Sequence, residues 1–207
     1  MVRAVLFDFG GVILTSPFDA FNRYEAEAGL PPDTIRRLNA TEPDRNAWAR
    51  FERGELDEAG FMEAFRLEAR VAGHEVDVAR ILEALRGDLR PAMVEAVRRC
   101  AFRLKTALLT NNFRRSGGEV PDAEVVAVTD LFHEIIESSV VGVRKPEVDF
   151  YRLACDRLGV GPEDCVFLDD LGVNLKPARA MGMTTIKVED PDVALGELEE
   201  VVGFALR

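Results

Sequence analysis

Five short apolar segments, separated by longer helix-like stretches, constrain most strongly what this chain of 207 residues can fold into. They are residues 4–9, 104–110, 134–138, 165–169 and 184–188. Short apolar runs rich in branched residues are typical of strands buried on both faces. Strands that alternate with helices predict a parallel sheet covered by helices on both sides. The sequence therefore predicts an α/β fold with a Rossmann-like, three-layer core.

The stretches between the later segments carry helical signals. Residues 92–100 follow Pro91, a residue suited to the first turn of a helix, and residues 146–158 form an apolar stripe that Gly159 ends. Residues 114–122 are polar and rich in glycine, which predicts a mobile loop.

Residues 16–90 differ from the rest because they contain no strand-like run. Helical periodicity appears at 18–28, 32–38, 57–71 and 78–85, with glycines between these stretches. The predicted organisation is therefore a core made of residues 1–15 and 91–207, with a small α-helical cap inserted at 16–90.

Composition excludes several classes of function. The net charge of −11 and the pI near 4.8 argue against a nucleic-acid partner, which requires a basic face. The cysteines, Cys100, Cys155 and Cys165, are odd in number and lack CxxC spacing, so no disulfide framework or zinc site is expected. No signal peptide is recognisable, and no apolar stretch approaches the roughly 18 residues of a membrane span. A cytoplasmic protein without a membrane partner is expected.

Polar residues gather where the predicted strands end. Asp8 ends the first strand, Thr110 and Asn111 end the second, and Asp169 with Asp170 ends the fourth. Because ligands bind at the carboxyl edge of an open parallel sheet, we expect these segments to converge. Lys145, at the start of the helix that leads to the fourth strand, is expected at the same edge.

The chemistry of these residues is complementary. Carboxylates from different strands form an oxygen site suited to Mg²⁺ and to phosphate partners. Thr110 offers a hydroxyl and a backbone N–H to a phosphoryl oxygen, and Lys145 offers a positive charge. Asp8 is a candidate covalent nucleophile that forms an aspartyl-phosphate, which water then cleaves. The expected partner is a small phosphorylated metabolite; whether the chain forms a homodimer stays open.

These four elements, in this order, resemble the haloacid dehalogenase superfamily, and the resemblance covers nearly the whole chain. The segment 167–179, with 143–147 and Phe150-Tyr151, is more narrowly similar to the N-terminal phosphatase domain of soluble epoxide hydrolase and to a related domain of acyl-CoA dehydrogenase fusions. The resemblance implies a hydrolase with a Rossmann-like core and an inserted helical cap.

The resemblance also implies residue roles. The metal would be bound by Asp8, Asp170 and the backbone carbonyl of Gly10, with Asp169 inside its coordination shell or next to it. Asp8 would be the nucleophile, with Thr110 and Asn111 on the phosphoryl group and Lys145 as the catalytic lysine. The further residues expected at the substrate are Gly11, Asn112 and, from the cap, Trp48, although aromatic residues at helical spacing are more often core.

Gly10 departs from the family pattern. Phosphatases of the superfamily usually carry there an aspartate that acts as general acid and base, and dehalogenases carry tyrosine. Glycine can do neither, although some sugar-phosphate phosphatases of the superfamily also have it. General acid–base help contributes about 10²–10⁴-fold in rate, so a substrate with a good leaving group would need it least.

The function expected from these observations is Mg²⁺-dependent hydrolysis of a small phosphate ester through Asp8. A 2-haloacid dehalogenase is the first alternative, against which the Asp169-Asp170 pair argues. A phosphate-binding module with weakened catalysis is the second, and Gly10 is the feature in its favour.

Overall fold

The computed structural model describes residues 1–114 and 122–207, so most of the loop expected at 114–122 lies outside the described residues. Its centre is a five-stranded sheet of order β3-β2-β1-β4-β5 in which every neighbouring pair is parallel. The strands are β1 (Ala4–Phe7), β2 (Lys105–Thr110), β3 (Glu134–Glu137), β4 (Cys165–Asp169) and β5 (Thr184–Lys187). The predicted α/β fold is confirmed. Strand β1 ends two residues earlier than predicted, because Asp8 caps the short turn η1 (Phe9–Ile13) that follows.

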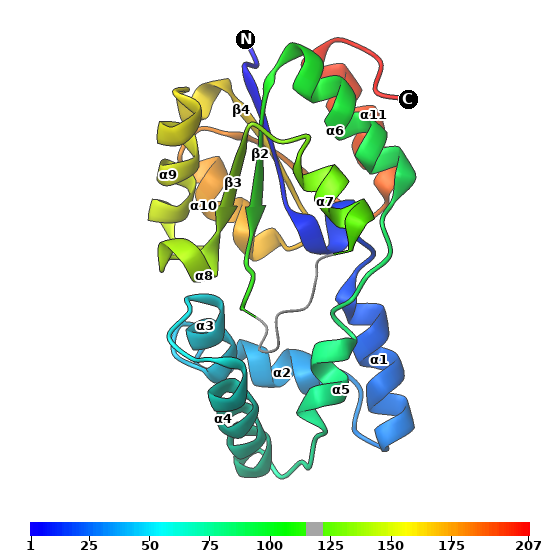
Figure 1. Ribbon diagram of the computed structural model, residues 1–207, viewed down its shortest axis with the longest axis vertical. Coiled ribbons are helices and arrows are strands. Elements are labelled where there is room, and N and C mark those ends of the chain that lie inside the picture. The colour runs from blue at the N-terminus through cyan, green and yellow to red at the C-terminus, as the bar shows by residue number, and fades with distance from the viewer. Residues whose placement is uncertain (115–121) are drawn as a thin grey trace.

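Two apolar layers sandwich the sheet (Figure 1). Alternate residues of β1 point to opposite faces, so Val5 and Phe7 pack with one layer and Ala4 and Leu6 with the other. The first layer includes α6 (Pro91–Arg103) and α11 (Pro191–Val202), and the second includes α9 (Val148–Leu158) and α10 (Gly172–Ala180). This double coverage explains why the central strands read as continuous apolar runs.

Most predicted helix ends agree with the structure. Helix α6 begins at Pro91, and α9 ends at Gly159, whose φ of 64° is the left-handed conformation that glycine adopts easily. The short helices α7 (Ala123–Thr129), α8 (Ser138–Val141) and η2 (Pro162–Asp164) were not predicted, because they contain too few residues for a helical period to appear. Helix α11, which has 12 residues, was not predicted either.

Residues 17–83 fold into helices that share an apolar cluster of their own. These are α1 (Pro17–Ala28), α2 (Thr34–Ala40), α3 (Ala47–Glu52), α4 (Glu58–Val71) and α5 (Val78–Glu83), drawn below the sheet in Figure 1. We call them the cap. The two chain segments that join the cap to the sheet run side by side, since Leu14 pairs with Leu89 and the Thr15 N–H donates to the Asp88 carbonyl at 2.9 Å.

The cysteines are free and buried. Cys165 opens β4, whereas Cys100 lies in α6 and Cys155 in α9. Within the described residues, no helix is both long enough and apolar enough to span a bilayer.

Candidate active site at the carboxyl edge of the sheet

Asp8 lies at the carboxyl edge, between β1 and β4. Its backbone N–H donates to the Leu168 carbonyl at 2.9 Å, and its Oδ1 accepts the Phe9 N–H at 2.7 Å, which caps η1. The residue is only 8% exposed. The chain thus holds a carboxylate rigidly in a place where burial is unfavourable without a partner.

Lys145 supplies that partner. Its Nζ lies 2.6 Å from Asp8 Oδ1 and 2.8 Å from Asp169 Oδ2, and the side chain is 1% exposed. Burial alone would lower the pKa of Lys145, but the negative charges of Asp169 and Asp8 outweigh it and raise the pKa. The ammonium group therefore stays charged and joins the ends of β1 and β4.

Asp169 is held on both of its oxygens. Oδ1 accepts the Leu171 N–H at 2.8 Å, and Asn174 Nδ2 bridges Oδ1 and Oδ2 at 3.0 and 3.1 Å. Asn174 is itself held in place, because the Tyr151 hydroxyl donates to the main-chain carbonyl of Asn174 at 2.7 Å. With Lys145 on Oδ2 as well, Asp169 anchors the lysine and has little capacity left for other ligands.

Asp170 lies against the backbone of Gly11. A Cβ on Gly11 would be 2.2 Å from Asp170 Oδ2, and the φ of Gly11 is +76°, so no other residue fits here. Burial, with the Asp169 charge adding to it, raises the pKa of Asp170 to about 6, although Lys145 and Arg90 oppose the rise. Gly11 therefore makes room for a carboxylate at the edge.

Arg90 is a residue of this site that sequence reasoning missed. Its Nη1 donates to the Gly11 carbonyl at 2.7 Å, which fixes the turn after Asp8. The only sequence signal was its place directly before Pro91, where the chain returns from the cap to the core.

The carboxylates of Asp8, Asp169 and Asp170 come within 4.8 Å of one another. Burial raises the pKa of Asp8 well above its usual value; Lys145 opposes this rise, whereas Asp169 and Asp170 add to it. Crowded carboxylates repel one another, and hard oxygen donors are what Mg²⁺ prefers. The donor set therefore fits a divalent cation, with Asp8 Oδ2 and Asp170 as the less occupied oxygens.

Asn111 holds the main chain of Lys145. Its Oδ1 accepts the Lys145 N–H at 2.9 Å, and its Nδ2 donates to the Lys145 carbonyl at 3.0 Å and to Glu52 Oε2 at 3.2 Å. The side chain expected at the phosphoryl group is thus engaged with the lysine loop. Thr110 precedes it as the half-buried last residue of β2.

Asn112 and Trp48, both expected at the substrate, have protein partners. Asn112 Nδ2 donates to Glu137 Oε1 at 2.6 Å, and its Oδ1 accepts the Ser139 hydroxyl at 2.9 Å. Trp48 stacks on Phe61 in the cap, with ring centroids 4.6 Å apart. Phe113, which follows Asn112 along the chain, stacks on the cap residue Phe51 at 4.5 Å. The polar pairs join Asn112 to the end of β3 and to α8, and the ring contact joins Phe113 to the cap.

Gly10 has open space where a side chain would be. Among residues 1–114 and 122–207, no atom lies within 4 Å of a Cβ built there. Its φ of −69° and ψ of 132° suit any residue. Glycine at this position is therefore not imposed by backbone or packing, in contrast to Gly11.

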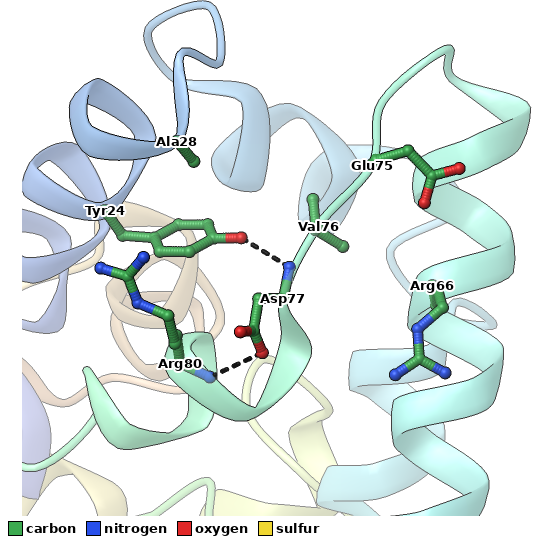
Figure 2. A pocket seen from close by; sticks show the side chains of 7 residues that line it. All are labelled: Tyr24, Ala28, Arg66, Glu75, Val76, Asp77 and Arg80. Carbon is green, nitrogen blue, oxygen red and sulfur yellow. Dashed lines mark hydrogen bonds between the residues drawn. The ribbon is translucent and has the colours of Figure 1, made fainter.

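Two hollows of the surface lie away from these carboxylates. Figure 2 shows the first, of about 480 Å³, within the cap between α1, α4 and α5. Its lining is Tyr24, Ala28, Arg66, Glu75, Val76, Asp77 and Arg80. The second, of about 430 Å³, includes Arg3, Phe102 and His133. Neither hollow includes a residue of the carboxylate cluster, so side-chain chemistry and not cavity size identifies the candidate site.

The chain is similar to known proteins over most of its length. A family model described as haloacid dehalogenase-like hydrolase matches residues 2–182. Acyl-CoA dehydrogenase family member 10 of Mus musculus is 36% identical over 99% of this chain and 19% of its own length. Bifunctional epoxide hydrolase 2 of Mus musculus is 33% identical over 98% of this chain and 39% of its own length. The chain thus spans less than half of these relatives. The sesquiterpene phosphatase astK of Aspergillus oryzae is 26% identical over 97% of both chains.

Solved structures share the fold. A HAD-like hydrolase from Porphyromonas gingivalis superposes with a TM-score of 0.68 at 20% identity, over 98% of both chains. A HAD family enzyme of Bacteroides thetaiotaomicron, in complex with magnesium and inorganic phosphate, gives 0.60 at 18% identity over 92% of this chain and 97% of its own. The L-2-haloacid dehalogenase of Xanthobacter autotrophicus gives 0.61 at 23% identity over 100% of this chain and 85% of its own.

Proposed function

This chain belongs to the haloacid dehalogenase-like hydrolases, and from that premise we propose that it is a Mg²⁺-dependent phosphatase of a small phosphorylated metabolite. The observation that carries the proposal is the ammonium group of Lys145 between Asp8 and Asp169, with Asp170 beside them. A nucleophile, a buried cation and a carboxylate set suited to a metal are the parts that phosphoryl transfer needs.

In the proposed reaction, Asp8 attacks the phosphorus atom. Lys145 Nζ and the Phe9 N–H hold the carboxylate through Oδ1, which fixes its orientation for the attack. The bond between phosphorus and the leaving oxygen breaks, and the alcohol departs with a proton taken from solvent or from the substrate itself. Water then attacks the aspartyl-phosphate, which releases inorganic phosphate and restores the Asp8 carboxylate.

The other residues bind and orient. Asp8, Asp170 and the Gly10 carbonyl would hold Mg²⁺, which when bound offsets the repulsion between carboxylate and phosphate. Thr110 and the backbone at Asn111 are assigned to the phosphoryl oxygens. Asp169 keeps Lys145 in place through its bonds to Leu171 and Asn174.

Gly10 narrows the substrate class within this proposal. Without a carboxylate two residues after the nucleophile, the chain lacks the general acid of most phosphatases of its family. Acyl phosphates and anomeric phosphates leave readily without a proton, so we propose substrates of this reactivity.

Turnover of p-nitrophenyl phosphate with Mg²⁺ tests the proposal. Asp8→Asn removes the nucleophile with little change of shape, and we expect turnover to fall by on the order of 10⁴-fold or more. Asp164→Asn, in a surface pair with Arg3, is the matched control and should leave the rate unchanged. A rate that survives Asp8→Asn contradicts the mechanism.

Two other functions are distinguished by separate measurements of halide release and of ligand binding. A 2-haloacid dehalogenase, with which this chain shares its fold, would release halide without Mg²⁺. A phosphate-binding module, which Gly10 favours, would bind Mg²⁺ and beryllofluoride tightly but leave every phosphate ester intact.

A further inference from the structure

Helix α3 of the cap ends beside the loop that carries Lys145. Its last residue, Glu52, accepts the Arg144 Nε–H at 2.6 Å and the Asn111 Nδ2–H at 3.2 Å on the same oxygen, Oε2. The side chains of Glu52 and Arg144 are 17% and 15% exposed. A carboxylate of the cap is thus inserted between two polar groups of the core.

The contact at Asn111 leads directly to the candidate catalytic lysine. The Asn111 side-chain amide, which donates to Glu52, is also bonded to the Lys145 main chain. It accepts the Lys145 N–H at 2.9 Å and donates to the Lys145 carbonyl at 3.0 Å. Arg144, the other partner of Glu52, is the residue before Lys145 in the chain. Glu52 therefore contacts both Asn111, which holds the Lys145 backbone, and the residue that precedes Lys145, whereas Lys145 Nζ lies 2.6 Å from Asp8 Oδ1.

We propose that Glu52 is a positioning residue, through which the docked cap sets Lys145 against Asp8. The proposal rests on the proposed function for its catalytic consequence, but the geometry of Lys145 can be measured without it. It assigns to the cap a role in assembling the reactive centre, in addition to the contact with substrate that a cap residue such as Trp48 could make.

The surroundings of Glu52 support a fixed geometry. The Arg144 Nη1 also donates to the Pro43 carbonyl of the cap at 3.2 Å. A Cβ on Gly54 would be 2.7 Å from the Ser139 carbonyl, so the turn after α3 is seated tightly on α8, as the facing helices in Figure 1 indicate. In such a place, loss of the Glu52 carboxylate removes a buried partner from both Arg144 and Asn111, and the lysine loop is free to shift.

A second ion pair between the cap and the lysine loop allows a positioning role of Glu52 to be distinguished from a contribution to cap binding alone. Arg53 Nη1 lies 3.1 Å from Glu147 Oε1, so this pair also joins the end of α3 to the lysine loop. Among the described residues, neither partner has a side-chain hydrogen bond to Asn111 or Lys145, and Arg53 also binds Glu55 and the Asp44 carbonyl. Glu147→Gln therefore weakens cap adhesion but leaves the clamp on Lys145 intact.

The test compares Glu52→Gln and Glu52→Ala with Glu147→Gln in the full chain. With p-nitrophenyl phosphate and Mg²⁺, we expect Glu52→Ala to lower kcat by about 10²-fold, as a displacement of about 1 Å can do, and to leave KM nearly constant. Glu52→Gln, which keeps the acceptor oxygen, should lie between this variant and the wild type. Glu147→Gln should keep the wild-type kcat.

A second readout needs no turnover. The ¹⁵N resonance of the Lys145 ammonium group, assigned with Lys145→Arg, should be sharp in the wild type because its protons are buried and bonded to two carboxylates. We expect it to shift and broaden in Glu52→Ala and to stay in place in Glu147→Gln. Melting temperatures measured in parallel report any general loss of stability.

The outcomes are distinguishable. Wild-type kcat and an unmoved Lys145 resonance in Glu52→Ala overturn the proposal, also if its melting temperature falls, because Glu52 is then only structural. If the wild type hydrolyses no phosphate ester but the resonance responds to Glu52→Ala and not to Glu147→Gln, the proposed function fails and the positioning role stands. If Glu52→Ala does not fold, the same comparison of Glu52→Gln with Glu147→Gln decides.

Discussion

The carboxyl edge of the sheet and the cap are built from different interactions. At the edge, buried charges meet at short distances, as between Lys145, Asp8 and Asp169. In the cap, aromatic rings such as Trp48, Phe51 and Phe61 stack in an apolar cluster, and one carboxylate, Glu52, reaches the Lys145 loop. The buried charges are thus concentrated at the edge of the core, while the cap is held mainly by aromatic packing and contacts the Lys145 loop.

The largest gain is expected from Gly10→Asp, which adds to the edge the acid that it lacks. Because the space is open and the backbone is ordinary, the variant should fold and raise kcat for alkyl phosphates, by up to about 10²–10⁴-fold. Esters of p-nitrophenol need little acid help and should gain little. Steady-state kinetics on both substrates, with Gly10→Asn as the control of equal size, measure this. Equal rates for the Asp and Asn variants would show that proton transfer does not limit turnover.

Lys145→Met tests whether the edge depends on its buried cation. We expect kcat to fall by about 10²–10³-fold, because one preorganised electrostatic contact is lost, and the protein to lose stability, because Asp8 and Asp169 remain buried without their cation. Lys187→Met, at an exposed lysine of β5 paired with Glu189, is the control and should match the wild type in turnover and urea unfolding. An active Lys145→Met would remove the lysine from the mechanism.

Phe61→Ala should separate the two regions most clearly. Phe61 is fully buried among the rings of the cap, so we expect the free energy of unfolding to fall by about 3–5 kcal/mol. Activity per folded molecule should change less than in Lys145→Met. Chemical denaturation and kinetics at low temperature measure both quantities. A loss of kcat as large as that of Lys145→Met would contradict the view that the carboxyl edge carries the chemistry and the cap rings serve packing.

The smallest effect is expected from Asp170→Asn, studied without metal. In the folded chain the pKa of Asp170 rises from its usual 3.8 to about 6, so its ionised form is disfavoured by folding. This penalty is absent below pH 3.8, grows as the pH rises toward 6 and is complete above it. At pH 7 in EDTA, Asp170→Asn should melt higher than the wild type, by on the order of 2–4 °C. The difference should vanish near pH 4, and thermal melts across this range check the sign.

The sheet and the order of its edge residues could be predicted because their signals are local. A short apolar run followed by a polar residue, as at Asp8 and Asp169, indicates a strand and its end without knowledge of the rest of the chain. The helices α3, α7 and α8 were missed for the opposite reason, since four to seven residues carry no clear period. Of the helices that were not predicted, α3 matters most for the site, because its last residue is Glu52.

Asn111 shows where sequence reasoning stops within the site. Its position after β2 was predicted, but its amide holds Lys145, a residue 34 positions away. Arg90 and Glu52 likewise act across 79 and 59 positions, on Gly11 and Asn111. No periodicity or spacing in the chain reports such contacts.

The sequence by itself thus determined the α/β fold, the family and the place of Asp8, Lys145 and the Asp169-Asp170 pair along the carboxyl edge. Only the tertiary structure decided that a side chain at Gly11 would collide with Asp170, that Gly10 leaves room for one, and that the cap reaches the loop of Lys145 through Glu52. Backbone periodicity and strand ends are properties of neighbouring residues. Steric room and hydrogen-bond partners arise only when distant segments pack together.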